Sequence, residues 1–199
     1  MKSSNVLVLL PFVAKGSLAT AVTRGLGERG FVTSAAFCGG APEIYERESL
    51  ANLRADERLL DLSAMPESVR LEALNRFASR HEIDVLLQFG APNLYRILPY
   101  VKESSPRIRL LDVLFNQLVY TQEHFLVEDA FDGVLVESQF MYDFIRRSSQ
   151  KPDPKIEFVV RARSRESNER PVLIDSYAGA ISRLAPKESV KPDATTGQE

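Results

Sequence analysis

Short apolar runs alternate with polar segments along this chain of 199 residues. Three runs stand out, IDVLLQFG, RIRLLDVLFN and FDGVLVESQFM, which lie within residues 83–141. Runs of Val, Ile and Leu without polar alternation are typical of strands in a parallel sheet that is covered on both faces. Weaker runs of the same kind precede and follow them. The predicted strands are residues 6–10, 31–37, 59–62, 83–89, 108–113, 133–137 and 156–160.

Amphipathic segments between these runs predict helices. The predicted helices run from Ser17 to Gly30 and over about residues 66–80, 95–101 and 139–147. In the second of them the period places four residues inward: Val69, Ala73, Leu74 and Phe77. Residues 39–58 are expected to form a loop with a short helical piece, and residues 115–128 show no clean period. Strands and helices at this spacing predict right-handed βαβ units, and therefore a Rossmann-like, doubly wound, mainly parallel α/β sheet with helices on both faces.

The character of the chain changes after residue 160. Residues 1–160 are predicted to form the Rossmann-like domain, and residues 161–170, where arginines alternate with small residues, a solvated linker. Leu173, Tyr177 and Ile181 then recur at helical spacing, so residues 171–185 predict an amphipathic helix. Residues 186–199 are polar and poor in apolar side chains, which favours a disordered tail.

Composition excludes several classes of function. The formal net charge is -2, so no overall field attracts nucleic acid or an anionic membrane. With Cys38 as the only cysteine and two histidines, we expect no internal disulfide, no zinc site and no other metal. No apolar run approaches the ~20 residues of a membrane span. The N-terminal VLVLLPFVA loosely imitates a signal peptide, but Pro11 interrupts it, so a buried first strand and a cytoplasmic location are expected.

The pattern G-x-G-x-x-G occurs once, from Gly25 to Gly30, in a position that does not fit nucleotide binding. A dinucleotide fingerprint follows the first strand and opens a helix, whereas these glycines close a helix. The turn in the phosphate position is instead Pro11 to Ser17, which lacks the Walker A spacing. Its Lys15 and the N–H groups near Ser17 are able to hold an anion or a sugar hydroxyl, and a plain strand-to-helix turn is an equal alternative.

The remaining candidate residues follow the ends of predicted strands, where open α/β sheets bind ligands. Gln88 and Gly90 follow one strand, Asp112 and Asn116 the next, with Tyr120 and His124 downstream, and Glu137 with Ser138 a third. Asp112, His124 and Glu137 are the candidate acid–base residues, although the catalytic residues stay unknown at this level. The alternatives are that Asp112 caps local N–H groups, that His124 is an ordinary surface histidine and that Ser138 caps the next helix.

The order of VLVLLPF, KGSLATAVTRGLGERGF, IDVLLQFG, LLDVLFN and FDGVLVESQFM over residues 5–160 resembles the N-terminal half of GT-B glycosyltransferases. The closest likeness is to the glycogen-synthase-like, family 4-type group. The resemblance implies an acceptor domain that is normally followed by a second Rossmann-like domain for a nucleotide-sugar. Carried over to this chain, it implies these substrate-binding positions: Lys15, Gly16, Ser17, Gln88, Gly90, Asp112, Asn116 and Tyr120, with His124 and Glu137 completing the cleft.

The chain departs from the family pattern in three places. Its first turn has only Gly16 where a glycine pair is usual, and Tyr120 stands where relatives often carry a histidine. From residue 159 it runs VVRARSRESNERP, where family members continue through a Pro-Asn-Gly turn into the donor domain. Because GT-B enzymes end in a helix that crosses back onto the N-terminal domain, we expect the helix at 171–185 to pack on the helices of the sheet.

These observations lead to a functional expectation with one main alternative. The chain is expected to be the N-terminal, acceptor-binding half of a glycosyltransferase for polysaccharide or glycolipid synthesis, inactive alone because the nucleotide-sugar domain is missing. No cofactor is expected on this chain, and a nucleotide-sugar donor is expected for the complete enzyme. The expected partners are a sugar or glycolipid acceptor and a partner chain or second copy at the exposed cleft, without nucleic acid, in the cytoplasm or at the inner face of the membrane. The alternative is a non-catalytic binding or interaction module; a nucleotide-binding enzyme of unrelated chemistry is a weaker third reading.

Overall fold

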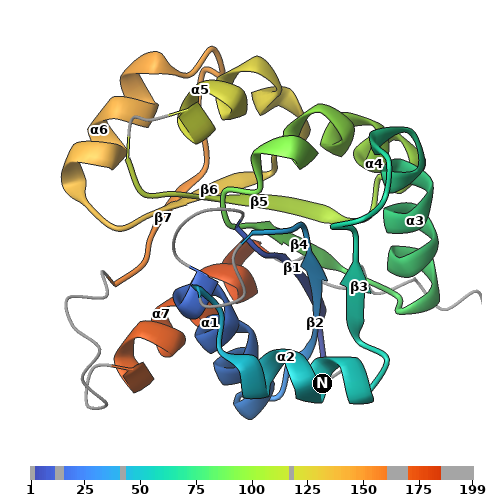
Figure 1. The fold of residues 1–199 in the computed structure, drawn as a ribbon. Coiled ribbons are helices and arrows are strands. Elements are labelled where there is room, and N and C mark those ends of the chain that lie inside the picture. Colours follow the sequence, from blue (N-terminus) through green and yellow to red (C-terminus); the bar gives the residue numbers. More distant parts are fainter. Residues whose placement is uncertain (1–2, 12–15, 41–43, 117–118, 161–169, 185–199) are drawn as a thin grey trace, which may run out of the picture.

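The computed structural model describes residues 3–11, 16–40, 44–116, 119–160 and 170–184. Seven strands form one sheet in the order β3-β2-β1-β4-β5-β6-β7 (Figure 1), and every neighbouring pair is parallel. The strands are β1 (Asn5–Leu9), β2 (Val32–Phe37), β3 (Leu59–Asp61), β4 (Val85–Gln88), β5 (Arg109–Leu114), β6 (Gly133–Val136) and β7 (Ile156–Phe158). The predicted fold class, a Rossmann-like parallel α/β sheet, is confirmed.

Helices connect the strands and cover both faces of the sheet. They are α1 (Gly16–Glu28), α2 (Arg47–Ala55), α3 (Glu67–Arg80), α4 (Leu98–Ser104), α5 (Val119–Leu126), α6 (Gln139–Ser148) and α7 (Arg170–Leu184), with 3₁₀ turns η2 (Pro92–Ile97) and η3 (Glu128–Ala130). Alternate residues of β1 serve the two layers: Val6 and Val8 pack toward α1 and α7, whereas Leu7 and Leu9 pack toward α3 and α4. This alternation explains why the strand has no polar side chain after Asn5, its first residue.

The direction of the chain across the sheet reverses beside β1. From β1 the chain proceeds outward through β2 and β3, then returns to place β4 on the other side of β1. The connections after β1 and β4 therefore diverge and leave a crevice at the carboxyl ends of these strands, the usual ligand position in such sheets.

Helix α7 belongs to the core, although a long segment separates it from β7. It lies beside α1 on the same face of the sheet (Figure 1), and Tyr177 and Ile181 on it are fully buried. At the closest approach Gly25 of α1 faces Ile174, and Arg29 forms an ion pair with Asp175. Because each buried side chain of this size contributes about 1.5–3 kcal/mol, α7 stabilises the domain.

The structure corrects two details of the predicted helices. Val69 is 43 % exposed, whereas Leu74 and Ala78 form the buried stripe of α3. Val69 and Leu74 are five positions apart on the helix, so their side chains point in directions that differ by about 140°. With Leu74 in the core, Val69 points away from it. The second difference is α5, which lies in the segment without a clean apolar period.

Three further expectations concern segments that lie partly or wholly outside the described residues. Of the predicted linker at 161–170, residues 161–169 lie outside the described residues, and Arg170 is the first residue of α7. The predicted tail at 186–199 and Lys15 also lie outside the described residues. Within the described ranges, no helix has both the length and the apolarity needed to cross a bilayer.

Candidate functional site

The carboxyl ends of β1, β4 and β5 surround a small pocket of about 80 Å³. Three of the predicted residues, Gly90, Asn116 and Tyr120, line it together. Gly90 has a φ of +80°, and the ring of Tyr120 lies over it, 3.6 Å from where a Cβ would be. A glycine is required here because other residues rarely adopt this left-handed backbone.

Gln88 does not line this pocket, but it fixes the backbone turn next to it. Its side chain is fully buried, its amide nitrogen donates to the carbonyl of Ala91 over 3.0 Å, and its amide oxygen accepts from the N–H of Ala91 over 2.9 Å. Both polar ends of the amide are thus used on the turn that follows β4. Gln88 holds the turn that presents Gly90.

The start of α1 borders the crevice on another side. Gly16 is buried so tightly that an added Cβ would lie 2.5 Å from the carbonyl oxygen of Ile44. The Thr20 hydroxyl donates to the Gly16 carbonyl over 2.9 Å. Ser17 is exposed and lies inside the first turn of the helix, one residue after its start at Gly16. A side chain larger than hydrogen at position 16 would therefore displace the segment around Ile44.

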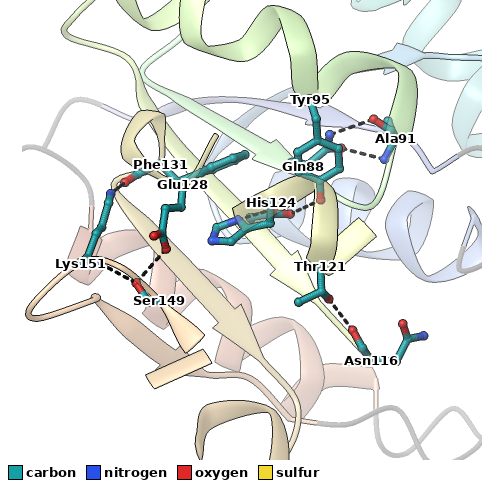
Figure 2. A network of polar contacts seen from close by, with 11 residues as sticks. Gln88, Ala91, Tyr95, Asn116, Thr121, His124, Glu128, Phe131, Ser149 and Lys151 are labelled. Atoms are coloured by element: carbon teal, nitrogen blue, oxygen red, sulfur yellow. Dashed lines mark hydrogen bonds and ion pairs between the residues drawn. The ribbon is translucent and has the colours of Figure 1, made fainter. Parts of the chain in front are cut away.

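Asp112 lies in the interior, in a buried polar cluster with Tyr95 and His124, which are labelled in Figure 2. Its Oδ1 accepts a hydrogen bond from the Tyr95 hydroxyl over 3.0 Å, and its Oδ2 lies 2.8 Å from Nδ1 of His124. Asp112 and Tyr95 are fully buried, and His124 is 2 % exposed with its ring against Phe131. Asp112 therefore ties α5 and η2 to the sheet, and it positions the helix that carries Tyr120.

Burial decides the protonation behaviour of this cluster. The pKa of Asp112 is raised because desolvation outweighs the hydrogen bonds and the charge of His124 and the bond from Tyr95. Burial, followed by the neighbouring Asp112 carboxylate, raises the pKa of Tyr95 well above its ordinary value.

Tyr95 is the member of this cluster that was not singled out from the sequence. It lies three residues after Pro92, on the same short helical segment as the buried apolar residues Leu94 and Ile97. A tyrosine among buried apolar residues usually needs a hydrogen-bond partner for its hydroxyl. That need is the one sequence signal that could have pointed to Tyr95 as part of a polar cluster.

Glu137 lies away from Asp112, at the end of β6 and near α7. Burial, and secondarily the charge of Glu137, raises the pKa of the Tyr177 hydroxyl well above its ordinary value. The Tyr177 ring stacks on Phe89 at 5.7 Å, and Phe89 in turn faces Phe115 at 5.9 Å. An aromatic layer therefore joins α7 to the wall of the pocket that contains Gly90.

Ser138 caps α6, as one of the two alternatives expected. Its side-chain oxygen accepts from the N–H of Met141 over 3.2 Å. Among the described residues no group of three or more His, Cys, Asp or Glu side chains is placed to hold a metal ion. The predicted site residues thus fall into a crevice group, a buried group around Asp112 and the separate Glu137, and their roles stay predictions.

No protein-family model and no curated protein matches the sequence. Solved structures do match. MurG from Acinetobacter baumannii superposes with a TM-score of 0.50 and 11 % identity, over 83 % of this chain and 47 % of that one. UGT2 from Phytolacca americana, complexed with UDP-2-fluoroglucose and pterostilbene, gives 0.48 and 11 % over 84 % and 56 %. The dTDP-glucose 4,6-dehydratase from Bacillus anthracis, with NAD, gives 0.45 and 11 % over 67 % and 54 %.

This chain spans about half the length of MurG and UGT2. At 11 % identity the likeness to MurG concerns the fold alone. The chain is therefore a Rossmann-like α/β domain whose fold is similar to part of a GT-B glycosyltransferase.

Proposed function

We propose that this chain is the acceptor-binding half of a GT-B-type glycosyltransferase and that it does not transfer sugar alone. The order and sequence of its strand segments resemble those of the glycogen-synthase-like, family 4-type group, which acts in polysaccharide or glycolipid synthesis. The nucleotide-sugar donor is bound by a second Rossmann-like unit. The enzyme works in the cytoplasm or at the inner face of the membrane.

The observation that carries this proposal is the lining of the pocket at the ends of β1, β4 and β5. Its described residues combine apolar side chains with the hydrogen-bonding groups of Asn116, Tyr120 and Thr121, and include no charged side chain. Such a wall suits a sugar or lipid-linked ligand. Stabilising a departing nucleotide phosphate needs cations or a set of aimed N–H donors, and the described wall of this pocket offers no cationic side chain.

The size of the pocket supports a second unit. A volume of about 80 Å³ holds one substituent of a ligand, well below the ~300 Å³ at which small-molecule sites begin. A site of useful size would form when another body closes the open side of the crevice. The match to 47 % of the length of MurG agrees with a half-enzyme.

Activity and donor binding of the isolated chain test the proposal. We expect no turnover of UDP- or GDP-sugars above the protein-free background. We also expect one cooperative thermal transition that these nucleotides do not shift. A ligand at 100 times its Kd would stabilise the fold by about 2.7 kcal/mol, which is a rise of about 5–10 °C at this size. Turnover, or such a rise with one nucleotide, would show that a donor site is already present.

Acceptor binding is tested with octyl glycosides as probes. We expect the glucoside, galactoside or N-acetylglucosaminide to bind, and Asn116→Ala to weaken that binding about tenfold, as expected for one lost hydrogen bond to a ligand. Asn52→Ala, on the exposed side of α2, is the matched control and should bind like wild type. Equal affinity of both variants would place the acceptor elsewhere.

The second candidate is a non-catalytic interaction module, and exposed aromatic side chains near β7 favour it. Phe140 is 60 % exposed and Phe158 46 % exposed, and the Phe158 ring stacks on Tyr142 at 5.1 Å. An exposed aromatic ring stacked on another, as Phe158 is on Tyr142, is a feature of partner surfaces. Light scattering over a range of concentrations separates the two functions: dimers that Phe158→Ser abolishes, together with no glycoside binding, would favour the module.

A further inference from the structure

A second pocket, of about 280 Å³, lies at the amino ends of the strands, whereas the crevice lies at their carboxyl ends. The amino ends of β6 and β7, the turn η3 and the segment after α6 enclose it. Its apolar wall is formed by Phe131, Val134 and Ile145. The volume is just below the ~300–1,000 Å³ of drug-sized sites, so it has room for a molecule with a single ring.

His124 gives this pocket a fixed hydrogen-bonding group. Nδ1 of His124 is held by Asp112, and among the described residues no hydrogen bond reaches the other ring nitrogen, Nε2. Figure 2 shows Nε2 turned away from Asp112, toward the side where Glu128 and Lys151 lie, and His124 is one of the residues that line the pocket. With Nδ1–H donated to the carboxylate, a neutral imidazole presents an Nε2 lone pair, which is an acceptor.

Two of the acidic groups around the pocket already have partners within the fold. The Glu128 carboxylate accepts from the Ser149 hydroxyl and from the N–H of Gln150, each over 2.7 Å. Asp132 lies 2.7 Å from Lys102 and 2.8 Å from Arg109. Neither carboxylate therefore needs a cationic ligand.

The charges at the wall balance overall, because the second cation on Asp132 offsets Glu128 and the other four charges cancel in pairs. Asp129 and Asp153 contribute two carboxylates, and Lys151 and Lys155 contribute two ammonium groups. Lys151 donates one bond to the Phe131 carbonyl over 2.7 Å, which leaves further N–H donors on the same ammonium group. The pocket thus offers acceptors and donors side by side with no excess of either charge.

We propose that this pocket binds a neutral polyhydroxylated ring of monosaccharide size. Each hydroxyl of such a ligand is both donor and acceptor, which matches Nε2 of His124, the Asp129 and Asp153 carboxylates and the lysines. The C–H face of a sugar ring packs against an aromatic side chain such as Phe131. The site is separate from the crevice, so this inference does not depend on the proposed glycosyltransferase function.

The imidazole resonances provide a direct test, because His81 and His124 are the only histidines. Glucose, mannose and N-acetylglucosamine are titrated into labelled full-length protein, and the ring nitrogens are followed by NMR. We expect one of these sugars to move the His124 Nε2 resonance saturably, with a Kd of about 1–10 mM, while His81 stays fixed. Shifts that are linear, or equal for both histidines, overturn the proposal. So does a response of His124 only to phosphate or spermidine, which would indicate a charged ligand.

Variants on the exposed rim avoid the loss of fold that His124→Gln risks. Asp153 is exposed, so Asp153→Asn should leave the melting temperature unchanged and weaken sugar binding about tenfold. Asp56→Asn, at the end of α2 far from the pocket, is the matched control and should keep wild-type affinity. Identical affinity of both variants would also overturn the assignment.

Discussion

Nδ1 of His124 lies 2.8 Å from Oδ2 of Asp112, and both side chains are buried between α5 and the sheet. The Tyr95 hydroxyl occupies the other carboxylate oxygen, so one acidic group receives two donors. Because a buried carboxylate that loses a partner costs more than the partner's bond contributes, this cluster should dominate the stability of the α5 side of the domain.

Asp112→Asn should lower the free energy of unfolding by about 2–4 kcal/mol. An amide has one carbonyl oxygen and an NH₂ group, so it cannot accept from Tyr95 and His124 at both positions. Urea unfolding followed by circular dichroism measures the change. Asp56→Asn, on the surface, should stay within about 0.5 kcal/mol of wild type. A similarly small effect of Asp112→Asn would contradict the proposed importance of the cluster.

Two tyrosine-to-phenylalanine changes should have opposite outcomes. Tyr95→Phe removes a donor from the Asp112 carboxylate and should cost about 1.5–3 kcal/mol. The Tyr177 hydroxyl is buried without a hydrogen-bond partner among the described residues, so Tyr177→Phe should be neutral or stabilising. Midpoints of urea unfolding compare the two, and a loss at Tyr177 as large as that at Tyr95 would reveal a partner for its hydroxyl.

Glycines in the same helix should respond differently to alanine. A Cβ at Gly25 would lie 2.6 Å from Cδ1 of Ile174 on α7, whereas a Cβ at Gly27 would meet its nearest atom at 3.4 Å. Gly25→Ala should therefore destabilise by about 1–3 kcal/mol through overpacking. Gly27→Ala should stabilise by up to about 1 kcal/mol through helix propensity. The melting temperatures of the two variants show whether each change stabilises or destabilises the fold. A stabilising Gly25→Ala would mean that α7 shifts away from α1 at little cost.

Asp132 should make stability depend on acid pH. Although burial raises its pKa, the stronger combined effect of hydrogen bonds from Lys102, the N–H of Leu110 and Arg109 lowers it below 3.8. The folded pKa is thus below the unfolded one. The stability that it contributes is present above the unfolded pKa and is lost as pH falls through the folded pKa.

The measurement is the difference in unfolding free energy between wild type and Asp132→Asn as a function of pH. We expect about 1.5–3 kcal/mol at pH values well above the unfolded pKa, shrinking steadily below it. Glu72→Gln, at an exposed carboxylate that pairs with Arg76 on α3, should show little difference at any pH. If the difference in unfolding free energy between wild type and Asp132→Asn does not change with pH, the charge of Asp132 is not what stabilises the fold.

Local patterns in the sequence were sufficient for the strands of the sheet and for most of its helices, with α5 as the exception. The run through β5 has no polar alternation because both faces are covered, and the glycines from Gly25 to Gly30 end a helix, as their position predicts. Ser138 caps α6 through a bond three residues away. These features depend on neighbours along the chain, so periodicity and spacing reveal them.

Tertiary structure decided what the polar residues do. Asp112 stands near a strand end in the sequence, yet its partners Tyr95 and His124 come from 17 residues before and 12 residues after it. They meet only because η2 and α5 fold onto the same face of β5. The same holds for Glu137, which lies near Tyr177 of α7. Sequence spacing determines which face of an element a residue occupies, whereas the group that faces it depends on how distant elements pack.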